Sequence, residues 1–465
     1  MTGSAFRGND TAMTIDQPRI CPLNEAPPDP AGRYVLYWMQ QAQRAEWNHA
    51  LEYAIARAAE RGLGVVVGFA LLDFPGAQAR HYAFMLDGLA ETAATLMTRG
   101  IKLVVRRGDA PEIMLSLARD AALVVCDRAC LRDLRAKRLA VAQQAGKEMV
   151  EIDADCVVPV DFASPKQEYA ARTIRPKIQE HWRHFLRDPG HATPARPTRD
   201  LPLASDVDPA DPAATLARLS PDTTAPPVDR FRGGLTRARA RLQRFLDHRL
   251  TDYANARSDP SQHVTSTLSP YLQYGQISVL EVVDRLRKAQ SGSPEDRRIF
   301  IEELIVRREL AANYAWYCPD YDSYAGLPDW ARRTLATHAE DPREYLYSQD
   351  QLVACATHDP YWNAAMREMV RSGYMHNYMR MYWGKKVLEW SVTPERAHAT
   401  LVMLNDRYLL DGFNANSYTG IGWIFGLHDR PWFERDIFGT VRYMAASGLK
   451  RKFDIDAYER WSHTL

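Results

Sequence analysis

The chain has 465 residues and a formal net charge of +1, with 46% hydrophobic and 25% charged residues. This length exceeds what one hydrophobic core usually supports, so two or three domains are expected, with room to bury a large cofactor. The composition is typical of a soluble globular protein, and the longest apolar run, "VVVGFALL" at 65–72, is much shorter than the roughly 20 residues of a membrane span.

Residues 1–30 are polar and rich in proline and contain no apolar signal-peptide core, so we expect a disordered tail and no secretion. The six cysteines form neither CxxC pairs nor clusters with zinc-ligand spacing. They suit the reducing cytoplasm, where we place the protein, and no bound metal is expected.

Residues 31–187 alternate short apolar runs with amphipathic stretches such as "QRAEWNHALEYAIARAAERG". The runs that predict buried strands are "YVLYWM" (34–39), "GVVVGFAL" (64–71), "KLVVRRG" (102–108), "ALVVCD" (122–127) and "MVEID" (149–153). Strands that alternate with helices predict an α/β domain with a doubly wound, Rossmann-like parallel sheet. No G-x-G-x-x-G follows the first strand, so the usual dinucleotide site is not supported. A ligand at the strand ends and a purely structural domain both stay open.

Residues 188–229 are rich in proline, aspartate, alanine and threonine, and they predict an extended linker. The charge changes sign at its end: residues 200–229 hold six aspartates against one arginine, whereas residues 230–257 hold eight arginines against two aspartates. The basic stretch is either a solvated helix or a face for nucleic acid.

Residues 230–465 have a helical pattern almost throughout and predict an all-α domain. The apolar spacing indicates helices within 239–257, 278–289, 297–317, 359–373, 375–391 and 394–412. Neither an internal repeat nor a zinc or calcium loop occurs among them.

Three clusters in this half have residues that could carry chemistry. The first, "TSTLSPYLQYGQIS" from Thr265, places four hydroxyls on five residues, with Ser269 as the expected N-cap of a helix. Hydroxyls and free N–H groups at a helix start can bind an anion, and Tyr253 could close over it. An ordinary capped helix would explain the same residues.

The second cluster is a series of tryptophans on two neighbouring helices. Trp362 lies in the first turn of one helix, whereas Trp383 and Trp390 lie two turns apart on the next, at a rise of about 10 Å. Indoles at such intervals suit stepwise electron transfer from the surface to a buried acceptor. The alternative is that they are ordinary core residues.

The third cluster begins at Asn405 in "LNDRYLLDGFNANSYTGIGW", where Asp411, further asparagines and several glycines follow the end of a helix. Such a segment either brings backbone close to a ligand or forms a loop with Asx turns. Arg380 is flanked by apolar residues, so a buried Arg380 would need a carboxylate partner, and we favour Asp411.

Taken in order, these motifs resemble the class II cyclobutane pyrimidine dimer photolyases. The resemblance rests on "TSTLSPYLQYGQIS", "THDPYWNA", "MHNYMRMYWGKKVLEWS", "LNDRYLLDGFNANSYTGIGW" and "KRKFDIDAY", and it extends to "YWMQQAQRAEWNHAL" and "QEYAARTIRPKI". It covers nearly the whole chain and implies an antenna-type α/β domain followed by a helical domain that binds FAD and DNA. The implied activity is that of a lyase that repairs the dimers in light with an electron from reduced FAD.

The resemblance also assigns roles to the residues of the three clusters. Those that would hold the FAD phosphates are Tyr253, Thr265, Ser266, Thr267, Leu268 and Ser269. Arg380 and Asp411 would pair beside the flavin, and Asn405 would lie near its N5 atom. The photoreduction chain, from the flavin outward to the surface, would be Trp383, Trp362 and Trp390.

The residues on the DNA side are implied in the same way. Photolyases are a known class of base-flipping enzymes, and the flipped dimer would be lined by Glu303, Arg257, Met381 and Trp423. Glu303 would hydrogen-bond a thymine carbonyl, and Trp423 would give the bases an apolar wall. Arg430 and Arg442, with the basic residues 450–452 nearby, would contact phosphates and fill the emptied duplex.

The chain departs from the family pattern at Arg307, where some relatives have a tryptophan one helical turn after the glutamate. Stacking on the dimer at this position is therefore in doubt. Nothing in the sequence selects a deazaflavin or any other antenna chromophore for the α/β domain. The expected partner is double-stranded DNA that carries a dimer, and we expect a monomer without membrane attachment or an obligate protein partner, associated with the nucleoid in a prokaryote.

Two other functions stay open. One is a cryptochrome-like blue-light photosensor, although such sensors usually carry a signalling extension and this chain stops thirteen residues after Lys452. The other is a flavoprotein or nucleotide-binding module that works in the dark, which would leave the tryptophan series without a purpose.

Overall fold

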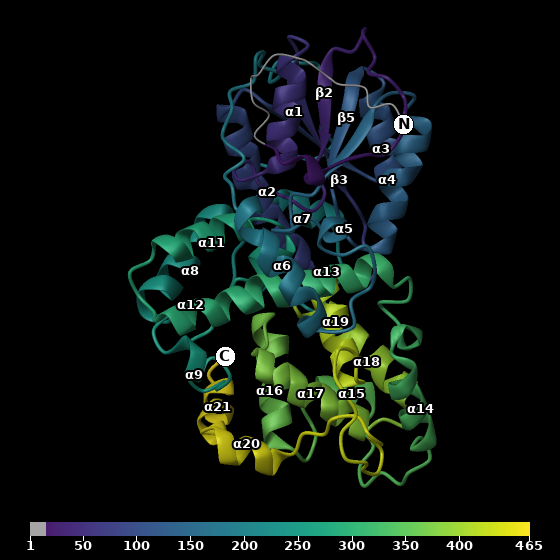
Figure 1. Cartoon of the computed structure of the whole chain (residues 1–465), viewed down its shortest axis with the longest axis vertical. Coiled ribbons are helices and arrows are strands. Elements are labelled where there is room, and N and C mark those ends of the chain that lie inside the picture. Colours follow the sequence, from purple (N-terminus) through teal and green to yellow (C-terminus); the bar gives the residue numbers. More distant parts are fainter. Residues whose placement is uncertain (1–14) are drawn as a thin grey trace.

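The computed structural model describes residues 15–465 (Figure 1). An α/β part occupies the top of Figure 1 and a helical part the bottom, and α12 (Pro294–Ile301) and α13 (Arg308–Tyr317) run across the view between them. The predicted fold class, an α/β sheet domain followed by an all-α domain, is confirmed. No helix among residues 15–465 is long and apolar enough to cross a membrane.

The sheet that the described residues form has the strand order β1-β6-β5-β2-β3-β4. Its strands are β1 (Ile20–Pro22), β2 (Tyr34–Trp38), β3 (Gly64–Leu71), β4 (Lys102–Arg107), β5 (Ala121–Asp127) and β6 (Met149–Ile152). The last five are parallel and lie where the apolar runs predicted them. Their near-continuous apolar sequences follow from burial on both faces.

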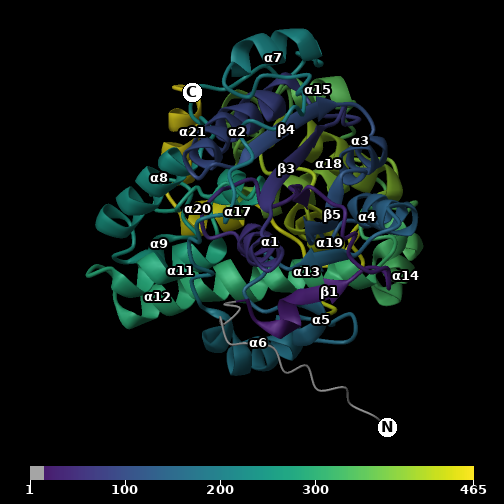
Figure 2. The same cartoon turned by 90° about the horizontal axis from the view of Figure 1, so that it is seen from above.

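Helices cover both faces of the sheet (Figure 2). One face packs against α1 (His49–Ala59) and α2 (Ala79–Thr98), and the other against α3 (Ala110–Ala118) and α4 (Arg132–Gln144). The strand order reverses between β2 and β5, which makes their carboxyl ends the crevice where ligands bind in doubly wound sheets.

The prediction of a disordered tail up to residue 30 is wrong for the part that the structure describes, whereas residues 1–14 lie outside it. Strand β1 pairs antiparallel with β6, with Ile20 opposite Ile152. The guanidinium of Arg19 is buried and donates to the carbonyl oxygens of Asp153 at 2.9 Å and Val157 at 2.7 Å. This segment is held by backbone pairing and one buried arginine, which hydrophobic periodicity does not reveal.

The segment predicted as an extended linker, 188–229, lies against the α/β part. The Thr198 hydroxyl donates to the Val65 carbonyl at 2.6 Å, and the Asp206 N–H donates to the Val105 carbonyl at 3.0 Å. Residues Pro212–Leu219 form helix α7, which the Asp211 side chain caps and which packs against α2. The expectation of an extended chain is therefore wrong for α7.

The helical part is helical almost throughout, as predicted, but two of the predicted helices are interrupted. Its helices are α8 (Leu235–His248), α9 (Tyr253–Ala256), α10 (Ser269–Gln273), α11 (Val279–Lys288), α12, α13, α14 (Asp329–Thr337), α15 (Gln349–Val353), α16 (Pro360–Ser372), α17 (Asn377–Glu389), α18 (Pro394–Tyr408), α19 (Ala415–Ile424), α20 (Ala446–Lys452) and α21 (Ile455–Ser462). The helix predicted over 239–257 breaks before α9, where Asp252 has a φ of 64°. The helix predicted over 297–317 contains a π-helical turn at Glu302–Arg307.

Shorter elements join the two parts. Helices α5 (Val160–Ala163) and α6 (Ala171–Phe185) follow the sheet, and α6 packs against the π-helical turn. Arg80 on α2 is buried and donates to the carbonyl oxygens of Tyr408 at 2.7 Å and Val370 at 2.8 Å in the helical part. The halves are therefore tied by buried polar contacts as well as by packing.

Candidate functional site

The hydroxyl-rich loop before α10 exposes hydrogen-bond donors. Among the described residues, no group accepts a hydrogen bond from the backbone N–H groups of 265–269 or from the side chains of Ser266 and Ser269. Thr267 has a φ of 52°, and its hydroxyl accepts from Arg241 Nη1 at 2.8 Å. The loop therefore presents unpaired N–H and O–H groups beside a fixed guanidinium, which is the chemistry of an anion site.

The N-cap of α10 differs from the prediction. Leu268 occupies the cap position, Ser269 is the first helical residue, and no side chain caps the helix. The Pro270 ring at the second position fits the helix start that the sequence predicted. Because no side chain occupies the first N–H groups, they stay available to a ligand.

The predicted pair of Arg380 and Asp411 forms. Arg380 Nη2 lies 2.9 Å and 3.0 Å from the two carboxylate oxygens of Asp411, and its Nε donates to the Met375 carbonyl at 2.9 Å. Although burial works against the charge, the Asp411 carboxylate keeps the pKa of Arg380 raised. The ion pair joins α17 to the turn after α18.

Asn405 lies near the end of α18 with only 4% of its surface exposed. Its Nδ2 donates to Asp406 Oδ1 at 2.8 Å, whereas its Oδ1 has no hydrogen-bond partner among the described residues. Asp406 also accepts from the Phe413 N–H at 3.0 Å and the Tyr418 hydroxyl at 3.2 Å. Asp406 therefore fixes the amide so that its oxygen is free for another donor.

The three tryptophans form one series through α16 and α17. Trp362 Nε1 donates to the Trp383 carbonyl at 3.0 Å, and the rings of Trp362 and Trp390 lie 5.6 Å apart between centroids. Trp383 Nε1 is buried and has no partner among the described residues. Trp390 is only 3% exposed, so the prediction that it reaches the surface is wrong: the rings of Tyr347, His358 and Trp362 pack against it.

Glu303 on the π-helical turn is the centre of a further group of polar contacts. It accepts from the Tyr253 hydroxyl and from Arg257 Nε, both at 2.7 Å, yet 41% of its side chain is exposed. Burial and the Glu303 carboxylate raise the pKa of Tyr253, so its hydroxyl stays protonated and donates. Tyr253 was expected to hold the FAD phosphates together with the loop 265–269. Its hydroxyl instead donates to Glu303, which was expected to bind the dimer.

Trp423 on α19 is half-buried between two cations. The Lys385 Nζ lies 5.0 Å from its ring centroid and donates to the Ile424 carbonyl, and the Arg442 Cζ lies 5.4 Å away. Lys385 is fully buried, and burial lowers its pKa to about 7. Met381, on the same helix as Lys385, is half-buried.

The two arginines predicted to contact DNA differ in their surroundings. Arg442 Nε donates to Asp429 at 2.9 Å, and its Cζ also lies 4.2 Å from the Trp432 ring, so the side chain is held between two indoles. Arg430 is exposed and has no carboxylate partner in the part of the chain described. Of the two arginines, Arg430 is therefore free of an ion pair with any described carboxylate, whereas Arg442 is paired with Asp429 and keeps 37% of its side chain exposed.

The remaining basic residues lie on exposed surfaces. Arg307 is 58% exposed and lies 3.5 Å from Glu302. Residues 450–452 are exposed on α20, where Lys452 Nζ donates to the Tyr378 hydroxyl at 3.1 Å. Among residues 15–465, no group of three His, Cys, Asp or Glu side chains could hold a metal ion.

Sequence reasoning missed four polar residues of these clusters: Arg241, Lys385, Asp406 and Asp429. Lys385 follows Trp383 in "YWGKK" and has the appearance of a surface residue. Asp406 could have been found, because it follows Asn405 and precedes the Asx-rich segment at the helix end. Nothing in the sequence links Asp429 to Arg442.

Known proteins resemble the chain over most of its length. The DNA photolyase family model matches residues 35–198. The deoxyribodipyrimidine photo-lyase of Methanothermobacter thermautotrophicus is 46% identical over 452 residues, which cover 96% of this chain and 98% of that protein. The protein of the same name from Potorous tridactylus is 39% identical, covering 91% of this chain and 80% of that one.

Solved structures share the fold at lower identity. A class III photolyase from Agrobacterium tumefaciens superposes with a TM-score of 0.72 at 21% identity, covering 92% of this chain and 86% of that chain. A Synechocystis cryptochrome has a TM-score of 0.71 at 18% identity, covering 94% and 89%. The match at 46% identity over nearly all of both chains places this one by sequence: it belongs to the deoxyribodipyrimidine photo-lyase family of DNA photolyases.

Proposed function

We propose that the protein repairs cyclobutane pyrimidine dimers in double-stranded DNA, and that it needs light to do so. The family membership supports the reaction, since relatives at 46% and 39% identity are named for it. The observation that carries the proposal is the contact series of Trp383, Trp362 and Trp390, which leads along α17 toward the Arg380–Asp411 pair. A module that works in the dark has no use for this series.

We further propose FAD as the cofactor of the helical part, because the donor groups present fit it. The unpaired N–H and hydroxyl groups of 265–269, with Arg241 beside them, suit its phosphates. The free Oδ1 of Asn405 and the unpaired Nε1 of Trp383 suit the polar edge of a flavin. When bound in its reduced form, FAD supplies the electron that opens the cyclobutane ring.

The chain's own residues then bind and orient the dimer. Glu303 accepts both of its hydrogen bonds within the chain, from Tyr253 and Arg257, which hold its carboxylate in place. Its exposed side therefore accepts from a thymine N–H, in place of the bond to a thymine carbonyl that the resemblance implied. Trp423 offers an apolar wall for the flipped bases, and Met381 lies on α17, the helix that packs against α19. Arg430, which is exposed and unpaired with any described carboxylate, is the side chain that contacts a phosphate.

The α/β part carries the second proposal that follows from the resemblance. An antenna chromophore such as a deazaflavin would bind in the crevice where β2 and β5 end, since this is the ligand position of the fold.

We also propose a monomer that acts in the cytoplasm on nucleoid DNA. The mass of the purified protein in solution and its absorption beyond that of flavin test these statements.

The central experiment is repair of a dimer-containing oligonucleotide by the purified protein under blue light and in darkness. We expect flavin absorption in the purified protein and loss of the dimer in light alone. A flavoprotein that shows photoreduction but no repair would favour a photosensor instead. Equal conversion in light and darkness would contradict the proposal altogether.

A further inference from the structure

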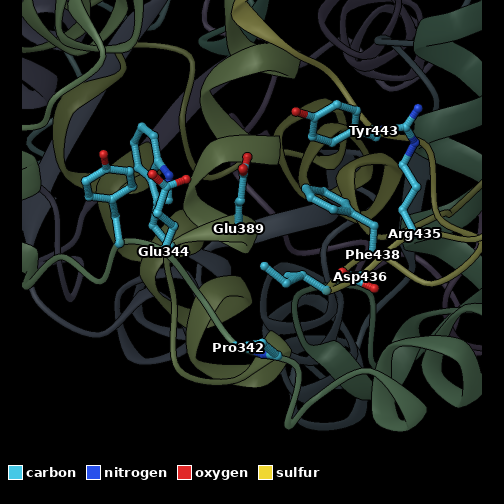
Figure 3. A pocket seen from close by; sticks show the side chains of 10 residues that line it. Pro342, Glu344, Glu389, Arg435, Asp436, Phe438 and Tyr443 are labelled. Carbon is cyan, nitrogen blue, oxygen red and sulfur yellow. The ribbon is translucent and has the colours of Figure 1, made fainter.

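A cavity of about 460 Å³ opens beside the last indole of the tryptophan series. Its lining comprises the rings of Tyr345, Trp390, Phe438 and Tyr443, the aliphatic Pro342 and Ile437, the carboxylates of Glu344, Glu389 and Asp436, and Arg435. Figure 3 shows Glu344 at the left, Glu389 near the centre, and Arg435, Phe438 and Tyr443 at the right. Apart from Trp390, none of these residues belongs to the clusters described above.

The cavity gives access to an indole that is otherwise covered. Trp390 is 3% exposed and Trp362 is fully buried, so a molecule in solution meets neither ring at the open surface. Trp390 nevertheless lines the cavity. The volume lies within the range of about 300–1,000 Å³ that small-molecule sites occupy. A small molecule in this cavity would lie next to the outer end of the electron route.

The charges of the lining favour some molecules over others. Glu389 is neutralised by Lys386, whose Nζ lies 2.6 Å from its carboxylate. Glu344 and Asp436 form no ion pair with any described cation, and Arg435, whose Cζ lies 5.0 Å from the Tyr443 ring, forms none with any described carboxylate. Two unpaired carboxylates against one guanidinium leave the cavity with a net negative charge, which repels anions.

We infer that this cavity is the docking site for the external one-electron donor that refills the tryptophan series, and that it takes small uncharged or cationic donors in preference to anionic ones. The inference rests on the proposed electron route. With a thiolate as donor, one electron passes to the oxidised Trp390 ring, the ring returns to its neutral form and the donor leaves as a thiyl radical. No proton has to move in this step.

The test compares two small thiols, cysteamine and 3-mercaptopropionate, which differ by two charges at the end remote from sulfur. The FAD-loaded protein is excited by a flash, and the decay of the tryptophan radical's absorbance is followed as each thiol is added. The variant Glu344→Gln/Asp436→Asn removes the two unpaired carboxylates and leaves the Glu389–Lys386 pair intact. The control, Asp200→Asn/Asp229→Asn, removes two exposed carboxylates outside the cavity.

We expect the ratio of the two decay rates, cysteamine over 3-mercaptopropionate, to fall by about tenfold in the cavity variant and to stay unchanged in the control. Comparing ratios cancels the different intrinsic reactivity of the thiols. Equal ratios in the parent and the cavity variant would overturn the docking site. No tryptophan radical in the parent would instead overturn the electron route of the proposed function, and the two failures are thus distinguishable.

Discussion

Trp383 is the residue on which the proposed electron route depends most directly. It is the member of the series closest in sequence to Arg380, and its carbonyl accepts the hydrogen bond that ties it to Trp362. Its buried Nε1 lacks a partner among the described residues, as expected where another group binds.

Replacing Trp383 with phenylalanine should nearly abolish photoreduction of the oxidised flavin, because phenylalanine is much harder to oxidise than an indole. Repair by enzyme reduced chemically beforehand should stay close to normal, since the series is then not needed. Absorbance during blue illumination and a repair assay in parallel measure both quantities. Trp316→Phe is the control, because Trp316 stacks on Arg135 at 3.7 Å away from the series. Equal photoreduction in parent and Trp383→Phe would exclude the assignment.

Lys385 is an unusual residue for the core, because among the described residues its amine donates only to the Ile424 carbonyl and otherwise lies against the Trp423 ring, while the charges of Asp429 and Arg442 act on it in opposite directions. Burial lowers its pKa to about 7, well below that of a lysine in an unfolded chain. Between these two pKa values the unfolded chain binds a proton that the folded chain does not. Folding is therefore favoured as the pH rises through this window.

We expect the stability of the parent relative to Lys385→Met to rise with pH. The free energy of unfolding should increase by about 1.4 kcal/mol more per pH unit in the parent than in the variant between pH 7 and pH 9. Denaturant unfolding of both proteins at three pH values measures this slope. Parallel pH profiles would show that Lys385 keeps an ordinary pKa in the folded chain.

At the scale of the elements, close contact between α17 and α19 supports the site. Gly384 follows Trp383 on α17, and a Cβ built there would lie 1.9 Å from Ile424 Cδ1 on α19. The same two helices carry Arg380, Met381 and Trp423. The distance between α17 and α19 thus sets how Arg380 and Met381 lie relative to Trp423.

Gly384→Ala should destabilise the protein although alanine is the better helix former. The propensity gain is at most about 1 kcal/mol, whereas forcing a methyl group into a packed contact costs about 1–3 kcal/mol. Gly448→Ala is the matched control, because on α20 an added Cβ meets no atom within 4 Å. Thermal unfolding of both variants measures the difference. A stabilised Gly384→Ala variant would mean that α19 moves away at little cost.

The π-helical turn at Glu302–Arg307 is the second structural feature at the scale of the elements that positions a site residue. It inserts one extra residue into an otherwise continuous helix and so rotates Glu303 relative to α13. Apolar spacing correctly predicted one long helix over this region, but the phase of its faces could not be predicted. The pairing of Glu303 with Tyr253 and Arg257 depends on that phase.

At the scale of the whole molecule, the surface that we propose for DNA has one arginine without an ion pair and one that is already paired. Arg430 is free of described carboxylates, whereas Arg442 is bound to Asp429 and held between Trp423 and Trp432. We expect the pairing with Asp429 to weaken any contact of Arg442 with a phosphate. We propose instead that its contact with Trp423 positions the wall of the dimer pocket.

Alanine substitutions should separate these roles in DNA binding. Arg430→Ala should weaken binding to damaged and undamaged duplex alike and lower the salt slope by about one unit. Arg442→Ala should leave the slope nearly unchanged and reduce the preference for damaged DNA, as should Trp423→Ala and Glu303→Gln. Affinities for both duplexes over a range of salt concentrations measure these effects. An unchanged slope in Arg430→Ala would place the DNA on another surface.

The sequence by itself determined the strands β2 to β6, the helical second half, and the pair of Arg380 and Asp411. These follow from local rules: apolar runs form buried strands, helical spacing forms helices, and a buried arginine needs a carboxylate. The family resemblance, which rests on long contiguous motifs, was likewise readable from the sequence and is confirmed by the relatives. The roles assigned to individual site residues stay predictions.

Only the tertiary structure decided which groups are already paired and which are free. Arg19 donates to a carbonyl just after β6, and α7 packs against α2. Trp390 is buried but lines a cavity, and Arg442 forms an ion pair with Asp429. Each of these depends on contacts between segments far apart in the chain, or on the phase of a helix across an irregular turn. Local pattern carries no information about such contacts, because the free energy of a polar side chain depends on the partners and the burial that the fold gives it.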